Sequence, residues 1–215
     1  MLNSRFVRIS DSHQLLFVHI QKTGGVSVEE ILESRLTDLR VHKGTRHPTR
    51  HPTLAQILRH EPALVDYWTF SVVRNPWDRM VSWWSMIDRN TQEANAGSDI
   101  SRERMERRKF WMGVAEYPDF ETFVSKGPEE FLRLRRSQFD YLVTPTRRPD
   151  WIGRTENFAS DARILFERLG LPADTPLPHR NKSTHGSYRD YYTPASRARV
   201  AELVNADFEE FGYEF

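Results

Sequence analysis

A lysine followed by a threonine and two glycines gives this chain its clearest chemical signal. Residues 15–20 are apolar and strand-length, Lys22 comes just after them, and an amphipathic helical pattern begins beyond Gly24 and Gly25. Glycines let backbone N–H groups approach a ligand closely, and a helix N-terminus carries partial positive charge. Together with the charge of Lys22, this segment predicts a cradle for a phosphate or a chemically related anion.

A second junction of strand and helix carries an arginine. Residues 67–73 form an apolar, β-prone run that stops at Arg74. Asn75 suits a helix N-cap, and Pro76 suits the first helical position. Since the planar guanidinium matches phosphate oxygens, Arg74 predicts a second anion site at the start of a helix over residues 76–88.

Other side chains could support the second anion site. Ser82 lies on the predicted helix that Arg74 enters, and its hydroxyl could reach back toward the strand end. The alternative is that Arg74 pairs with Asp78 and Ser82 is only exposed. Arg154 in a short strand motif and Lys182 after a proline-rich loop are further candidates, with a structural network and a solvated lysine as their respective alternatives.

Strands alternating with helices must bring these junctions together. Strands are predicted at 15–20, 67–73 and 151–153, and helices at 26–36, 54–59, 76–88, 119–125, 128–136, 158–169 and 193–211. This order predicts an α/β fold with a mainly parallel central sheet flanked by helices, in a single domain spanning residues 1–215. Ligands of such sheets bind at the carboxyl ends of the strands, so both junctions should face one crevice.

One charged stretch interrupts this pattern. Residues 89–110 show no apolar periodicity in their first half, and they contain Gly97. We expect a mobile insertion or lid that becomes helical toward its end.

Composition excludes several classes of protein. The 215 residues include 31 Lys and Arg against 30 Asp and Glu, a formal net charge of +1, which argues against a nucleic-acid partner. The absence of cysteine excludes disulfides, thiolate catalysis and cysteine-bound zinc. No apolar run reaches the ~18 residues of a membrane span, and residues 1–14 do not resemble a secretory signal. We therefore expect a cytoplasmic protein without a membrane span.

The first loop differs from the Walker A loop of nucleoside triphosphatases. In that loop the lysine follows the glycines, whereas Lys22 precedes Gly24 and Gly25. No apolar strand ends in an aspartate suited to the Mg²⁺ that triphosphates need. A smaller anion held without metal is expected. The alternatives are a kinase-like, nucleotide-dependent phosphotransferase and a non-catalytic module that binds nucleotides or sulfated glycans.

Several segments resemble, in the same order, the motifs of the PAPS-dependent sulfotransferases of the carbohydrate, Golgi-type group. The resemblance covers residues 17 to 215 and is carried by residues 17–27, 72–82, 151–158, 181–183 and 191–194. It implies a P-loop-like sulfotransferase fold and 3′-phosphoadenosine 5′-phosphosulfate (PAPS) as sulfuryl donor, with PAP as product. The implied acceptor is a small molecule or glycan, with a carbohydrate or glycolipid hydroxyl preferred. Gln21 replaces the proline of many members.

The resemblance also suggests roles for the residues of both junctions. The 5′-phosphate would be held by Thr23, Gly24, Gly25, Val26 and Ser27, through backbone N–H groups and the two hydroxyls. Lys22 would stabilise charge on the oxygen that bridges phosphorus and sulfur. Arg74 and Ser82 would bind the 3′-phosphate.

Sulfuryl transfer also needs a base for the acceptor hydroxyl. Histidine is the natural candidate near neutral pH. His51 and His47 lie in a basic loop where related enzymes can place a base, and His51 ranks first because it leads directly into a predicted helix. A structural role is expected for His19. Glu30 and Glu33 are alternative bases.

Overall fold

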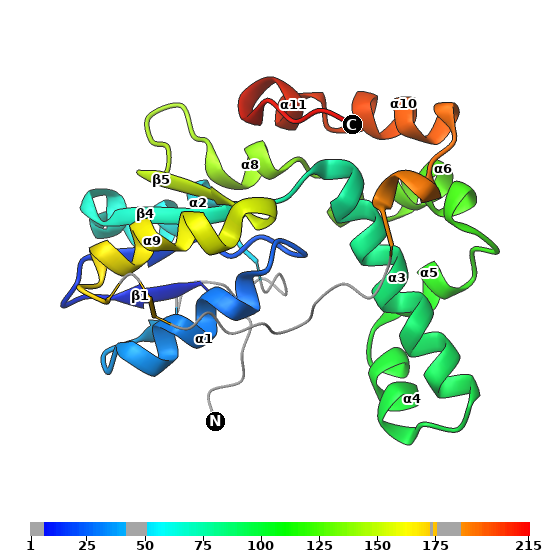
Figure 1. Ribbon diagram of the computed structural model, residues 1–215, viewed down its shortest axis with the longest axis horizontal. Helices are drawn as coiled ribbons and strands as arrows, with labels where there is room; N and C mark the ends of the chain where they lie inside the picture. The colour runs from blue at the N-terminus through cyan, green and yellow to red at the C-terminus, as the bar shows by residue number, and fades with distance from the viewer. Residues whose placement is uncertain (1–6, 42–50, 173, 176–185) are drawn as a thin grey trace. The chain divides into compact units, whose positions relative to one another are not determined.

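The computed structural model describes residues 7–41, 51–172, 174–175 and 186–215 (Figure 1). His47 and Lys182 lie outside these residues. The chain divides into two compact units. We call residues 1–74 and 138–182 the sheet unit, and residues 75–137 and 183–215 the helical unit. The single-domain expectation stays a prediction.

The sheet unit contains five strands in the order β3-β1-β2-β4-β5. Their bounds are β1 Arg8–Ser10, β2 Leu15–Phe17, β3 Arg40–Val41, β4 Trp68–Val73 and β5 Trp151–Arg154. β4 pairs in parallel with β2 and β5, whereas β1 pairs antiparallel with β2 and β3. The predicted α/β class is confirmed. β1 and β3 were not predicted, and they make one half of the sheet antiparallel.

Helices cover this sheet. They are α1 Gly25–Arg35, α2 Leu54–His60, α8 Gln138–Leu142 and α9 Phe158–Arg168, with short 3-10 turns η1 Pro62–Asp66 and η2 Thr155–Asn157. α1 and α9 share one apolar core with β2 and β4. Thr53 caps α2, since its hydroxyl accepts from the Gln56 N–H at 3.2 Å. β2 is shorter than predicted, although Val18 and Ile20 beyond it are buried.

The described residues of the helical unit form helices and connecting loops and include no strand. The helices are α3 Pro76–Asn95, α4 Asp99–Glu106, α5 Lys109–Ala115, α6 Phe120–Glu130, α7 Leu132–Arg135, η3 Tyr188–Tyr191, α10 Pro194–Leu203 and α11 Asn205–Phe211. The start of α3 is as predicted, because Asn75 accepts from the Trp77 N–H at 3.0 Å and Pro76 occupies the first position. Buried aromatic rings, including Trp77, Trp83 and Phe123, form much of its core.

The region 89–110 is more helical than predicted. α3 continues to Asn95, and α4 follows after a short turn. Ser101 donates to the Glu93 carboxylate at 2.6 Å, and buried Met105 of α4 belongs to the same apolar cluster as Ile87 of α3. The prediction of irregular structure in the first half of this region was therefore wrong. Its movement as a lid stays a prediction.

Two further helix boundaries differ from those predicted. Pro128 lies inside α6 instead of beginning a new helix. The predicted helix 193–211 is divided into α10 and α11 at Val204, whose φ of −129° and ψ of 39° depart from helical values. Thr193 caps α10, its hydroxyl accepting from the Ser196 N–H at 3.2 Å.

Candidate functional site

The loop between β2 and α1 turns through two left-handed residues. Lys22 has φ +68° and Gly24 has φ +78°. Glycine adopts this conformation freely, whereas a lysine does so at a cost of about 1–3 kcal/mol. Buried Thr23 stabilises the turn by donating its hydroxyl hydrogen to the Ile20 carbonyl at 3.0 Å. Backbone strain thus coincides with the lysine that the sequence singles out for catalysis.

The first turn of α1 has no side-chain cap. Within the described residues, the backbone N–H groups of Gly25 and Val26 have no acceptor, while that of Ser27 donates to the Gly24 carbonyl at 2.9 Å. A helix N-terminus with unsatisfied donors and partial positive charge suits an anion. Two of the predicted phosphate-binding N–H groups are therefore available, and that of Ser27 already has an acceptor within the turn.

Gly25 is required by close packing. A Cβ built there would lie 2.2 Å from both Cδ2 and Nε2 of His19, so no larger residue fits without movement. His19 is buried, and its Nδ1 lies 3.1 Å from Oε1 of buried Glu29. Arg8, with its Nε 3.8 Å from the same oxygen, also pairs with Glu33. This buried network gives His19 the structural surroundings that the sequence predicted.

His51 is held beside the same loop. Its Nδ1 lies 2.9 Å from the backbone carbonyl oxygen of His19, and the two imidazole rings meet edge to face with centroids 4.7 Å apart. A carbonyl oxygen only accepts, so Nδ1 carries the hydrogen and the lone pair of the neutral ring is on Nε2. The first-ranked base candidate is therefore next to the Lys22 loop, with a defined tautomer.

Arg74 brings the second junction to the first. Its side chain is buried, and Nη1 donates to the Lys22 carbonyl at 3.4 Å. Gln138, which is fully buried, accepts from the Arg74 N–H at 2.9 Å and donates to the Arg74 carbonyl at 2.7 Å. Because β2 and β4 pair in parallel, the segments that follow them lie side by side in the sheet unit. A common crevice for both junctions stays a prediction. Gln138 was not predicted, since it lies 64 residues from Arg74 in sequence.

Thr155 joins the carboxyl ends of all three parallel strands. Its hydroxyl lies 2.9 Å from the Thr23 carbonyl oxygen and 3.0 Å from that of Val73. The sequence did not single it out, although it stands next to Arg154. Arg154 lies opposite Val73 in the sheet, and its backbone N–H donates to Asp161 at 2.7 Å. Ser82 lies in α3 of the helical unit, where it is buried.

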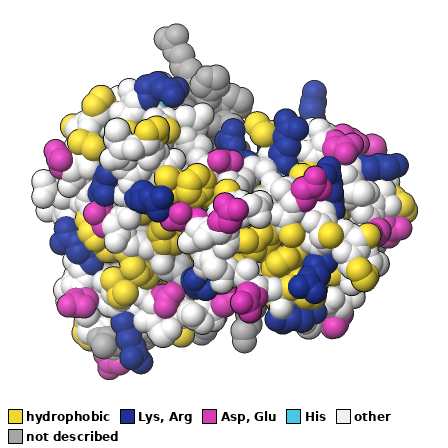
Figure 2. Space-filling view, turned by 90° about the horizontal axis from the view of Figure 1, so that it is seen from above, with side chains coloured by type: hydrophobic (Ala, Val, Ile, Leu, Met, Phe, Trp, Pro, Cys, Tyr) yellow, Lys and Arg dark blue, Asp and Glu magenta, His cyan; other side chains and the backbone are white. Residues whose placement is uncertain are grey.

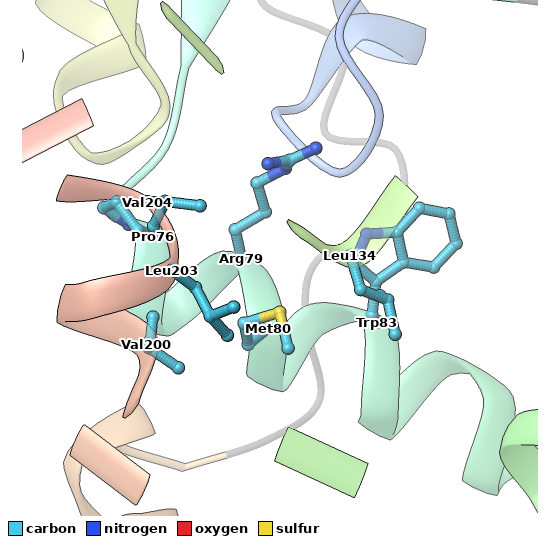
Figure 3. A pocket seen from close by; sticks show the side chains of 8 residues that line it. All are labelled: Pro76, Arg79, Met80, Trp83, Leu134, Val200, Leu203 and Val204. Atoms are coloured by element: carbon cyan, nitrogen blue, oxygen red, sulfur yellow. The ribbon is translucent and has the colours of Figure 1, made fainter. Parts of the chain in front are cut away.

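The helical unit has a pocket of its own. It is lined by Pro76, Arg79, Met80, Trp83, Leu134, Val200, Leu203 and Val204 (Figure 3). The lining is mostly apolar, and the charged end of Arg79 extends away from Met80 and Leu203. None of the predicted site residues lines this pocket, so we do not assign it to the reaction.

The described residues contain neither a candidate metal cluster nor a helix suited to span a membrane. Among them, no group of three or more His, Asp or Glu side chains is arranged to hold a metal ion. In the same residues, no helix combines the length and apolarity needed to cross a membrane.

Basic side chains have local partners rather than forming a uniform patch. In the run from 102 to 109, Arg102 pairs with Asp99 at 3.0 Å and Arg107 with Glu103, while Arg108 lies over the Trp111 ring. Figure 2 shows Lys and Arg side chains interspersed with Asp and Glu over the face in view. These contacts indicate that the charges of this run are paired locally on the surface.

The fold and the loops define an α/β protein with a candidate anion site at the carboxyl ends of its parallel strands. Residues 5–214 match the model of the sulfotransferase family, and the chain belongs to this family. It is a PAPS-dependent sulfotransferase, as its motifs predicted. Among solved structures it is similar to mouse sulfotransferase SULT7A1 complexed with PAP, at 15% identity and a TM-score of 0.45, covering 94% of this chain and 87% of that chain. A comparison with curated proteins found no match.

Proposed function

We propose that this protein transfers the sulfuryl group of PAPS to a hydroxyl of a carbohydrate or glycolipid by in-line displacement with a general base. The observation that carries this proposal is the contact of Arg74 Nη1 with the Lys22 carbonyl at 3.4 Å. PAPS carries charge at its 5′ and 3′ positions, so it needs two anion sites at a fixed separation. The preference for a carbohydrate depends on the resemblance to the carbohydrate-type enzymes.

The turn from Thr23 to Ser27 fits the 5′-phosphosulfate end of the donor. Its support is the uncapped start of α1, with the N–H groups of Gly25 and Val26 lacking acceptors among the described residues. The Thr23 hydroxyl hydrogen is committed to Ile20. We therefore propose that Thr23 binds the 5′-phosphate through its backbone N–H. The Gly24 N–H and the Ser27 hydroxyl would bind the same phosphate. PAPS supplies the activated sulfuryl group.

Arg74 is the residue we assign to the 3′-phosphate. Its guanidinium presents several donors in one plane, and Gln138 fixes its backbone through two hydrogen bonds. Ser82 is proposed as a second ligand of this phosphate. Arg154 and Lys182 are proposed as further contacts to the nucleotide.

Proton transfer and charge stabilisation are assigned to two side chains of the sheet unit. His51 would take the proton of the acceptor hydroxyl at Nε2, since Nδ1 donates to the His19 carbonyl. The Lys22 ammonium would stabilise the charge that develops on the leaving phosphate oxygen, a role worth roughly 3–4 kcal/mol for a well-placed donor. His47 is the second choice for the base.

Transfer of labelled sulfate tests this function. The purified protein is supplied with ³⁵S-labelled PAPS and a panel of glycans, glycolipids and phenols, with thermal shifts by PAP and by Mg²⁺-ATP measured in parallel. We expect stabilisation by PAP and label on a glycan or glycolipid. Label on phenols alone would contradict the acceptor class. Stabilisation by Mg²⁺-ATP alone would favour the phosphotransferase, and binding of PAP without any transfer would favour the binding module.

A further inference from the structure

The Thr155 hydroxyl links the two anion-binding junctions directly. Its oxygen lies within 3.0 Å of a carbonyl from each junction, Thr23 after β2 and Val73 at the end of β4. Both carbonyls must therefore stay close to one another as long as they share this donor. These contacts span 132 and 82 residues, and both lie within the sheet unit.

The orientation of two carbonyls fixes the orientation of two N–H groups. In a trans peptide the N–H points away from the carbonyl of the same unit. The Thr23 carbonyl belongs to the peptide that carries the Gly24 N–H, and the Val73 carbonyl belongs to the peptide that carries the Arg74 N–H. Thr155 thus directs the Gly24 N–H away from itself, and it holds the peptide from which the Arg74 side chain departs.

Arg74 acts on the neighbouring peptide in the same way. Its Nη1 donates to the Lys22 carbonyl, which belongs to the peptide carrying the Thr23 N–H. Two consecutive peptides of the loop are therefore oriented by donors from the other strand ends, one by Arg74 and one by Thr155. The Thr155 methyl group also lies near Gly24, 3.9 Å from the position of a Cβ built there.

We infer that Thr155 is a positioning residue that sets the spacing between the 5′-phosphate loop and Arg74. Through this spacing it determines the preference for a nucleotide that carries both phosphates. The inference rests on the proposed function, because it assigns the two phosphates to these two junctions. A ligand with two charged groups binds most tightly when the distance between the two sites matches the distance between those groups. Its affinity falls when the distance between the sites varies.

The experiment compares Thr155→Val, which keeps the shape and removes the hydroxyl, with Thr155→Ser, which keeps the hydroxyl. Calorimetry on the full chain measures the affinities for PAP and for adenosine 5′-monophosphate. We expect the preference for PAP over the monophosphate to fall about tenfold or more in Thr155→Val and to be retained in Thr155→Ser. Thr144→Val is the matched control, because the Thr144 hydroxyl donates to the Arg147 carbonyl at 2.9 Å, a bond that ties no predicted site residue.

Each outcome bears on the inference. A Thr155→Val protein that keeps the wild-type preference within about twofold overturns it, and so does an equal loss in Thr144→Val. If Thr155→Val does not fold, Thr155→Cys replaces it, since a thiol is a weak donor and should give an intermediate preference; a wild-type preference in that variant overturns the inference. If the wild-type protein itself shows no preference for PAP, the proposed use of PAPS is contradicted as well. This result distinguishes a failure of the proposed function from a failure of the inference about Thr155.

Discussion

His51 donates from Nδ1 to the backbone carbonyl of His19, over 2.9 Å. The ring of the same residue, His19, fills the space left by Gly25 at the start of α1. The ring of His19 is in turn fixed by Glu29. The buried ring of His19 thus contacts both Gly25 in the first turn of α1 and the ring of His51. The candidate anion site and the candidate base therefore pack against the same side chain.

Removal of the His51 ring should abolish base catalysis without loss of donor binding. We expect His51→Ala to lower kcat by about 10²–10⁴-fold and to remove the acidic limb from the pH dependence of kcat/KM, while the affinity for PAP stays near wild type. Steady-state transfer of labelled sulfate between pH 5 and 9 measures this. His60→Ala, which changes an exposed histidine of α2, is the control. An unchanged pH profile in His51→Ala would transfer the role to another group.

Substitution of Lys22 should lower turnover without lowering the stability of the fold. Lys22→Ala keeps a non-glycine residue at φ +68° and should fold like wild type, but we expect its turnover to fall about 10²–10³-fold. Lys22→Gly should show the same loss of turnover together with a gain of about 1 kcal/mol in the free energy of unfolding, because glycine adopts this conformation without strain. Transfer assays and urea unfolding measure the two effects. Turnover of Lys22→Ala within about tenfold of wild type would exclude the proposed role.

Local signals in the sequence predicted the two junctions. The lysine and glycines of the first loop and the Asn75 cap with Pro76 each depend on neighbours within a few residues, so their chemistry determines the local geometry. The same holds for β4, whose six residues are long enough to show their apolar character.

Other features depend on contacts that only the fold provides. Gln138 and Thr155 are ordinary polar residues in sequence, and they gain their roles from partners 64 to 132 residues away. β1 is three residues long, too short for a periodic pattern, and one of the three is the buried Arg8. A charged residue inside a strand contradicts the usual pattern, and its burial becomes acceptable because Arg8 pairs with Glu29 and Glu33 on α1.

Gly25 should tolerate no side chain while His19 is present. In Gly25→Ala the new methyl group would meet the buried His19 ring at 2.2 Å, so the ring or the start of α1 must move. We expect a loss of about 1–3 kcal/mol in the free energy of unfolding together with weaker binding of PAP. Urea unfolding and calorimetry measure these effects.

The double variant His19→Ala with Gly25→Ala provides the control for this clash. Without the ring the methyl group has room, so the double variant should be less destabilised than the sum of the two single variants. Strict additivity of the two losses would show that the packing of His19 is not the reason for the glycine.

Asp38 should contribute to stability above about pH 4 and lose its contribution in acid. Burial raises the pKa of Asp38, but hydrogen bonds from the Ser12 N–H and from the Ser10 and Ser12 hydroxyls outweigh it and lower this pKa to about 2. The folded state therefore favours the ionised carboxylate, whose ordinary pKa is about 4. Its stabilisation is fully present above that value and declines as the pH falls toward 2.

Asp38→Asn isolates this contribution, because the amide keeps the shape and does not titrate. The difference in free energy of unfolding between wild type and Asp38→Asn should be largest at neutral pH and should shrink between about pH 4 and pH 2. Urea unfolding at a series of pH values measures it. Asp99→Asn, which removes an exposed partner of Arg102, is the control and should change stability by less than about 1 kcal/mol. A difference for Asp38→Asn that stays constant down to pH 2 would show that the carboxylate of Asp38 is not held ionised by Ser10 and Ser12.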